Sequence, residues 1–172
     1  MQPKVLAAIA LLFLAGCSSQ PYVAPAGTET ALLRVVDPRT GVMPASTRIS
    51  TFEKAETCEG SQYLYDPQFP SHNSQMIEGF ARIEAGKPFS LMVFRWSIVG
   101  PNASSNCIII VTFVPAPGRH YLVESSWIRS DQCHMQVKSA DSASMSNAQV
   151  EKVRRRARDY PLDASSRHCK PG

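Results

Sequence analysis

Residues 89–99 read FSLMVFRWSIV, and this stretch decides the fold. Side chains alternate between the two faces of a strand, so Phe89 and Leu91 share one face while Phe94 and Trp96 share the other. Apolar residues therefore stand on both faces, which is typical of a strand buried inside a β-protein. We expect Phe94 and Trp96 to lie in the core.

Segments of the same type lie on both sides of this stretch. Residues 107–114 form a nearly continuous apolar run, as in a central strand. Shorter β-like segments cover residues 31–36, 47–53, 63–65, 77–84, 119–128 and 132–138. Clusters of Pro, Gly, Asp and Ser separate them, and no helical pattern lies between them. The sequence therefore predicts an all-β fold, a β-sandwich of seven to eight mostly antiparallel strands.

One α-helix is expected near the C-terminus. Ser146 and Gln149 have the spacing of a capping box, and Pro161 would end the helix. An apolar stripe recurs at helical spacing at Val150, Val153, Ala157 and Tyr160. We therefore predict a C-terminal helix that begins at Ser146 and ends before Pro161.

The predicted helix is strongly basic. Five cations fall within seven residues: Lys152, Arg154, Arg155, Arg156 and Arg158. Such a cluster could contact lipid headgroups, lipopolysaccharide, peptidoglycan carboxylates or an acidic partner protein, mainly by charge. A solvated face that keeps the helix soluble is the simpler interpretation, and we favour it.

The N-terminus has the features of a secretory signal peptide over residues 1–16. Lys4 precedes a short apolar run that ends in small residues, and the run is too short to span a bilayer, which takes about 20 residues. The quartet Leu14-Ala15-Gly16-Cys17 resembles the lipobox of bacterial lipoproteins, in which the cysteine is acylated. The resemblance implies lipidation of Cys17, with palmitate among the acyl chains. Ser18, in place of aspartate, implies an outer-membrane address.

The rest of the chain fits one domain with tails. We expect a lipid-anchored tether over residues 17–30, the β-sandwich domain over 31–140, and the helix with a disulfide-tied tail over 141–172. A hydrophobic content of 44% is enough for a packed core, and a net charge of +4 is too small to indicate nucleic-acid binding.

The cysteines predict two disulfides. Beside Cys17 the chain has Cys58, Cys107, Cys133 and Cys169. An even number in an oxidising compartment indicates disulfides, and three pairings are possible. We expect Cys58–Cys107 and Cys133–Cys169, because the second would hold the C-terminal tail. A metal site with the neighbouring histidines lacks the usual ligand spacing, so no metal or cofactor is predicted.

Catalytic motifs do not stand out. The sequence has no G-x-S-x-G elbow, paired-carboxylate motif, phosphate loop or calcium loop, so we predict no catalytic residues and no enzyme. His72 lies in a predicted loop, where binding residues often occur. Trp127 could stack on a sugar ring if exposed, although a core position is the simpler expectation.

Two further motifs extend the resemblance. Residues 86–89, GKPF, precede a predicted strand, and residues 113–123, FVPAPGRHYLV, link two strands. With the lipobox, Cys58, Cys107 and Cys133, they resemble small uncharacterised lipoproteins of Gram-negative bacteria, which carry an F-x-P-x-x-G-x-x-Y element. The resemblance covers most of residues 31–138 and implies no catalytic residue.

These observations predict a periplasm-facing lipoprotein of the outer membrane that acts as a non-enzymatic binding or scaffold module of the cell envelope. Its partners would be membrane lipid, through Cys17, and an envelope protein or anionic envelope polymer, not nucleic acid. One alternative is a periplasmic protein that binds a glycan or small ligand through Trp127 or His72. A second is a hydrolase without a recognisable motif.

Overall fold

The computed structural model describes residues 20–36, 45–65, 76–77, 79–101, 103–129, 132–158 and 168–170. The predicted sites at Cys17 and His72 lie outside these residues. The strands are β1 (Thr30–Val36), β2 (Ala45–Lys54), β3 (Glu59–Tyr65), β4 (Met76–Ile77), β5 (Phe80–Glu84), β6 (Phe89–Gly100), β7 (Ala103–Phe113), β8 (His120–Arg129), β9 (Gln132–Ala140), β10 (Gln149–Val150) and β11 (Arg154–Arg155).

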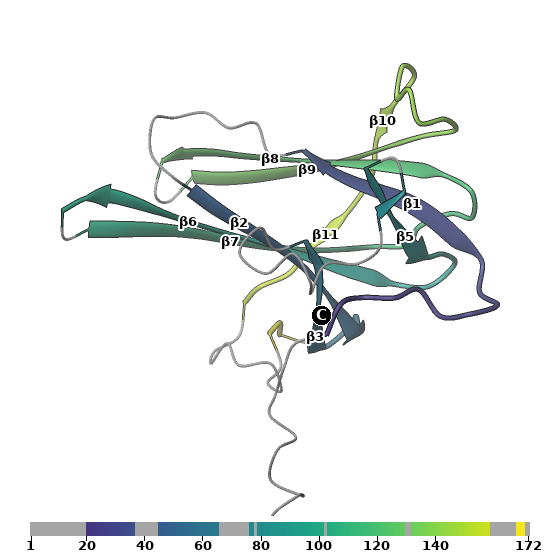
Figure 1. Ribbon diagram of the computed structural model, residues 1–172, viewed down its shortest axis with the longest axis horizontal. Helices are drawn as coiled ribbons and strands as arrows, with labels where there is room; N and C mark the ends of the chain where they lie inside the picture. The colour runs from purple at the N-terminus through teal and green to yellow at the C-terminus, as the bar shows by residue number, and fades with distance from the viewer. Residues whose placement is uncertain are drawn as a thin grey trace, which may run out of the picture.

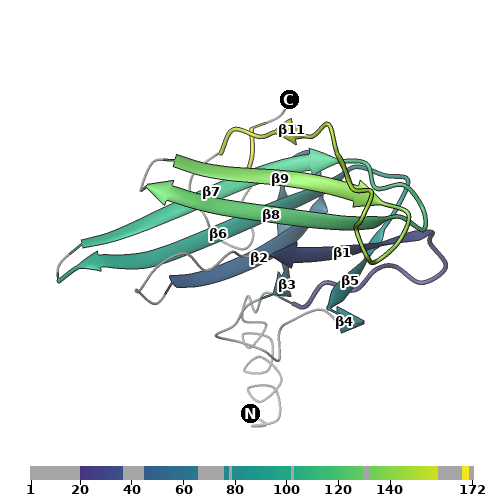
Figure 2. The ribbon, with the colours of Figure 1, turned by 90° about the horizontal axis from the view of Figure 1, so that it is seen from above.

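Two sheets form a β-sandwich-like fold. One has the strand order β10-β9-β8-β1-β5-β4 and the other the order β11-β7-β6-β2-β3. Figure 1 shows them as two layers, and Figure 2 shows the same layers from above. Among the described pairings of these strands, β1 with β8 is parallel and the others are antiparallel. The prediction of an all-β, mostly antiparallel fold is confirmed, with eight strands of five or more residues.

The main core lies between the two sheets. Phe89 pairs with Phe113 and Leu91 pairs with Val111, so strands β6 and β7 present one continuous apolar face. Tyr121 and Val123 of β8 belong to the same buried cluster, on the sheet that faces it. Burial of this face from water is the main favourable contribution to folding.

Phe94 and Trp96 are not part of this core, contrary to the prediction. They lie on the opposite face of β6, in register with Ile108 and Asn106, and are half-buried. Residues 89–99 are apolar on both faces, so alternation alone did not say which face is inside. The six-stranded sheet decides it, because Tyr121 and Val123 of that sheet pack on the face that carries Leu91.

A smaller apolar cluster covers the outer face of the five-stranded sheet. Phe52, Met92 and Ile110 are buried there together with Cys58 and Cys169. The turn after β2 and the C-terminal residues 168–170 therefore lie against the back of the sandwich. Burial of Cys169 in this cluster holds the C-terminal end of the described chain against the sheet.

The predicted helix is wrong for the described residues of that region. Residues 141–148 are turns and bends, and they are followed by β10 and β11. Val150, which the helical stripe placed inward, is 62% exposed, whereas Arg156 is buried. The physical reason is that the open edges of β9 and β7 offer this segment hydrogen-bonding partners, which override a weak local helical preference.

Two disulfides are present, as predicted, but the expected pairing is wrong. Cys107 bonds to Cys133, and Cys58 bonds to Cys169. Cys107 belongs to the core between the sheets, whereas Cys58 belongs to the cluster on the outer face. The two side chains therefore lie on opposite sides of one sheet and cannot meet. Cys107–Cys133 joins the sheets by linking β7 to β9.

The predicted tether over residues 17–30 is part of the folded body from Gln20 onward. Pro21 forms a bridge with Tyr63 of β3, and Tyr22 is buried in the main core. β1 already begins at Thr30. The proline and small residues of this segment suggested a linker, but burial of Tyr22 and backbone bonds to Tyr63 anchor it.

Candidate functional site

The basic segment forms a strap over the sandwich edge, and we call residues 149–158 the C-terminal strap. Its first part pairs with β9 as β10, and the Glu151 amide donates to the Val137 carbonyl over 2.8 Å. Its second part pairs with β7 as β11, and the Arg156 amide donates to the Ile110 carbonyl over 2.9 Å. The strap thus connects the edges of both sheets and satisfies backbone groups that would otherwise be open.

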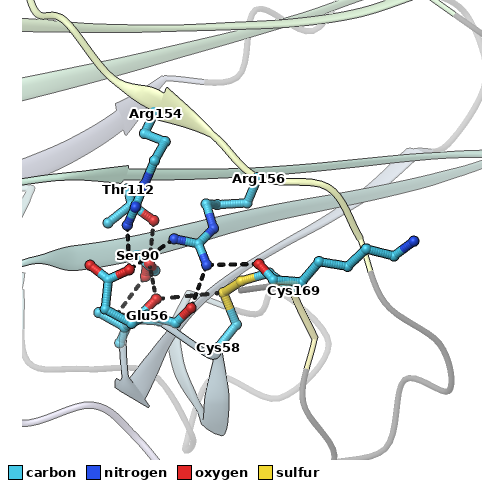
Figure 3. Close-up of a disulfide and its surroundings, with 10 residues drawn as sticks. Glu56, Cys58, Ser90, Thr112, Arg154, Arg156 and Cys169 are labelled. Atoms are coloured by element: carbon cyan, nitrogen blue, oxygen red, sulfur yellow. Dashed lines mark hydrogen bonds and ion pairs between the residues drawn. A yellow bond between two sulfur atoms is a disulfide. The ribbon is translucent and has the colours of Figure 1, made fainter. Parts of the chain in front are cut away.

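We call Arg156 and the two residues that it bonds, Glu56 and Lys170, the Arg156 cluster. Figure 3 shows its surroundings. The Arg156 side chain is 2% exposed, and Nη1 donates to the Glu56 carboxylate over 3.0 Å. Nη2 donates to the Glu56 carbonyl and, over 2.8 Å, to the Lys170 carbonyl. One buried guanidinium therefore joins the strap, the turn after β2 and the C-terminal residues 168–170.

Arg154 binds the same carboxylate from the exposed side. Its Nη2 donates to Glu56, so two guanidinium groups share one acid. The hydrogen bond from Arg154 and then that from Arg156 lower the pKa of Glu56 below its ordinary value. Glu56 is 56% exposed, so solvent screens part of this interaction.

The turn after β2 is also bonded to a side chain of β6. Ser90 Oγ donates to the Ala55 carbonyl over 2.6 Å and lies 2.6 Å from the Thr112 hydroxyl. Cys58, at the end of the turn, has a φ of 53°, a conformation that residues other than glycine rarely adopt. The disulfide to Cys169 and the Arg156 contacts hold the backbone in this conformation (Figure 3).

The structure therefore gives most of the predicted basic residues an internal partner. Arg154 and Arg156 bind Glu56, and Arg155 Nη2 donates to the Cys133 carbonyl over 2.9 Å. Arg158 forms a backbone bridge with Cys169. Lys152 and Arg155 are exposed on the strap. These contacts mainly connect parts of the fold.

Glu56 is the residue that sequence reasoning missed. It lies 100 positions before Arg156, within an ordinary polar turn. A lone glutamate in such a turn has no local pattern that would identify its partners. The strand pairing brings it under the strap.

The side chains of the other two predicted binding residues, His72 and Trp127, lie outside the described part of the structure. The backbone of Trp127 pairs with Cys133 in the β8–β9 hairpin, and its side chain is not among the described ones. His168 is buried beside Phe52, with ring centroids 5.3 Å apart. Among the described residues, no group of three or more His, Cys, Asp or Glu side chains is arranged to hold a metal ion.

An open pocket of about 250 Å³ lies near the N-terminal segment. Its lining residues are Tyr22, Val23, Pro25, Phe52, Glu53, Gln62, Glu84, Lys87, Pro88 and Phe89. Lys87 pairs with Glu84 over 2.8 Å at its rim, and Gln62 donates to Glu53 over 3.4 Å. The pocket has an aromatic floor and a polar rim, and no local sequence pattern predicted it.

Comparison with known proteins identifies no similar protein. No family model matches the chain, and neither a curated protein nor a solved structure matches it. Within the described part of the chain, no helix is long and apolar enough to cross a membrane.

Proposed function

We propose that this chain is a periplasm-facing lipoprotein of the outer membrane that acts as a non-enzymatic binding or scaffold module of the cell envelope. The observation that carries the proposal is the use of the cysteines. Four of the five are consumed in Cys58–Cys169 and Cys107–Cys133, which leaves Cys17 of the Leu-Ala-Gly-Cys sequence for acylation.

The disulfides also support the compartment. Structural disulfides persist in the bacterial periplasm and are rare in the cytosol. Cys58 and Cys169 are completely buried, and Cys107 lies in the core between the sheets. Buried cysteines that link distant segments are typical of a structural role rather than of metal or redox chemistry.

The strap supports the choice of contact surface. Lys152 and Arg155 are exposed on a segment whose backbone pairs with β9 and with β7, one strand of each sheet. A rigid surface loses little conformational entropy when it binds, and its cations favour an acidic protein or an anionic envelope polymer.

Anchoring is tested first, in cells that incorporate an alkyne analogue of palmitate. The wild-type chain should be labelled and recovered with outer membranes, and Cys17→Ser should be unlabelled. An unlabelled wild-type chain recovered as free periplasmic protein would overturn the proposal.

The contact surface is tested by cross-linking in cells, followed by mass spectrometry of the attached proteins. The double variant Lys152→Glu with Arg155→Glu should lose its main partner. The control Arg82→Glu reverses an exposed charge on another surface and should keep it. A partner lost equally from both would place the interface away from the strap.

The open pocket favours a second candidate, a binder of a glycan or another small polar ligand. Its polar rim, with Gln62 and Glu53, suits hydroxyl groups, although its volume is below the usual range for ligand sites. Saturable binding of a purified cell-wall saccharide, lost in Gln62→Ala and kept in Lys152→Glu, would favour this candidate over the scaffold.

A further inference from the structure

The N-terminal segment is bonded to the sheet as an additional edge partner of β3. The Tyr22 amide donates to the Tyr63 carbonyl over 2.8 Å, and the Tyr63 amide donates to the Gln20 carbonyl over 2.9 Å. Pro21, between them, forms a parallel bridge with Tyr63. The chain is therefore fixed to the β3 edge as soon as the described residues begin.

Tyr22 holds this segment in the core. It is 7% exposed, and its ring meets Phe89 edge to face with centroids 5.8 Å apart. Its hydroxyl accepts a hydrogen bond of 3.0 Å from the Glu84 amide. Release of the segment would expose an aromatic side chain and leave the partly buried Glu84 amide without its acceptor, so the attachment resists the thermal motion expected of a linker.

Cys17 is only three residues before Gln20. A fully extended chain covers at most about 3.6 Å per residue, so the two residues are separated by no more than about 11 Å. A flexible tether over residues 17–30 could extend to about 47 Å, about four times as far. The position of the lipid is therefore tightly coupled to the position of the β3 edge.

From this relationship we infer that the acyl chains on Cys17 hold the β3 edge and the rim of the pocket against the lipid headgroups. The inference rests on the proposed acylation of Cys17. The membrane surface is then the neighbour of one end of the sandwich. The exposed Val23 and Lys87, which both line the pocket, belong to this membrane-facing region.

The same geometry turns the C-terminal strap away from the membrane. β3 and β11 are the two outer strands of one sheet, separated by four strand spacings, or about 19 Å. Figure 2 shows them on opposite sides of the molecule. Lys152 and Arg155 then face the periplasm, where a soluble or cell-wall partner can reach them.

The test is lysine labelling of the full-length acylated protein in vesicles of phosphatidylethanolamine and phosphatidylglycerol. A membrane-impermeant amine reagent is followed by peptide mass spectrometry, with the protein in detergent micelles as reference. The Lys87 side chain is 70% exposed, and Lys152 is exposed on the strap, so both react in detergent. We expect vesicles to reduce labelling of Lys87 several-fold and to leave Lys152 unchanged.

A tether variant provides the control. Insertion of a Gly-Ser linker of about twelve residues between Ser19 and Gln20 adds about 19 Å of average reach and should restore labelling of Lys87 while the protein stays on the vesicles. An acylated wild-type chain that binds vesicles yet labels Lys87 as in detergent would overturn this inference alone. A chain without acyl mass that does not bind vesicles would overturn the proposed function and this inference together.

Discussion

Arg156 and Glu56 are 100 residues apart in the sequence, yet Nη1 of Arg156 lies 3.0 Å from the Glu56 carboxylate. The guanidinium is buried and the carboxylate is half in solvent. The pair connects the strap to the turn after β2, and the second hydrogen bond to the Glu56 backbone fixes that turn. Part of the predicted basic surface therefore serves to join distant segments of the fold.

Replacement of Arg156 should be far more costly than replacement of Arg154. Arg156→Gln removes bonds to the Glu56 and Lys170 carbonyls as well as the ion pair, and we expect a loss of about 2–4 kcal/mol in the free energy of unfolding. Arg154→Gln removes an exposed ion pair and should cost at most about 1 kcal/mol. Urea denaturation followed by fluorescence measures both. Equal losses would show that burial of Arg156 is unimportant.

Glu56 should contribute to the loss of stability in acid. The hydrogen bonds from Arg154 and Arg156 lower its pKa in the folded protein below the ordinary value, so its contribution is present above the ordinary pKa and is lost as the pH falls through the folded pKa. The difference in unfolding free energy between wild type and Glu56→Gln should therefore be largest at neutral pH and shrink in acid. Urea titrations across that range test it. A difference that does not change with pH would contradict the expectation.

The two disulfides should be found as Cys58–Cys169 and Cys107–Cys133 in non-reducing peptide maps. Their sequence separations are 111 and 26 residues, and the chain-entropy model then gives about 5 kcal/mol and about 3.5 kcal/mol of stabilisation. Replacing the Cys58–Cys169 pair by serine should therefore destabilise the protein more than replacing the Cys107–Cys133 pair. The opposite order would show that the native environment of the bonds outweighs the unfolded-chain term.

Tyr22 should act as the anchor of the N-terminal segment. Tyr22→Ala leaves a cavity beside Phe89 and should cost about 2–4 kcal/mol, whereas Tyr22→Phe keeps the ring and should cost about 1–2 kcal/mol. Amide hydrogen exchange at Tyr63, whose amide donates to Gln20, should accelerate strongly in Tyr22→Ala alone. Unchanged exchange in Tyr22→Ala would mean that the segment is held by other contacts.

Alkaline pH should weaken the same anchor. Burial raises the pKa of Tyr22, against the opposing hydrogen bond from the Glu84 amide. The stabilisation is complete below the ordinary pKa of tyrosine and is lost as the pH rises through the raised pKa of the folded protein. The alkaline decline in unfolding free energy should therefore be smaller in Tyr22→Phe. An identical decline in both proteins would assign it to other groups.

The fold class could be predicted because local patterns carry it. Alternating or continuous apolar runs such as residues 89–99, broken by Pro, Gly and Asp clusters, are compatible with strands and with little else. The presence of two disulfides also followed from the even number of cysteines remaining beside Cys17. The strands depend on the pattern of neighbouring residues, and the number of disulfides depends on the number of cysteines.

The sequence by itself determined the eight longer strands and the number of disulfides, whereas the tertiary structure decided every long-range choice. Which face of β6 is inside depends on where the other sheet packs, and which cysteines meet depends on the side of the sheet on which each side chain lies. The strap became β10 and β11 instead of a helix because β9 and β7 left edges to be paired. The physical reason is common to all three: hydrogen bonds and burial between distant segments outweigh local preferences of a few tenths of a kcal/mol per residue.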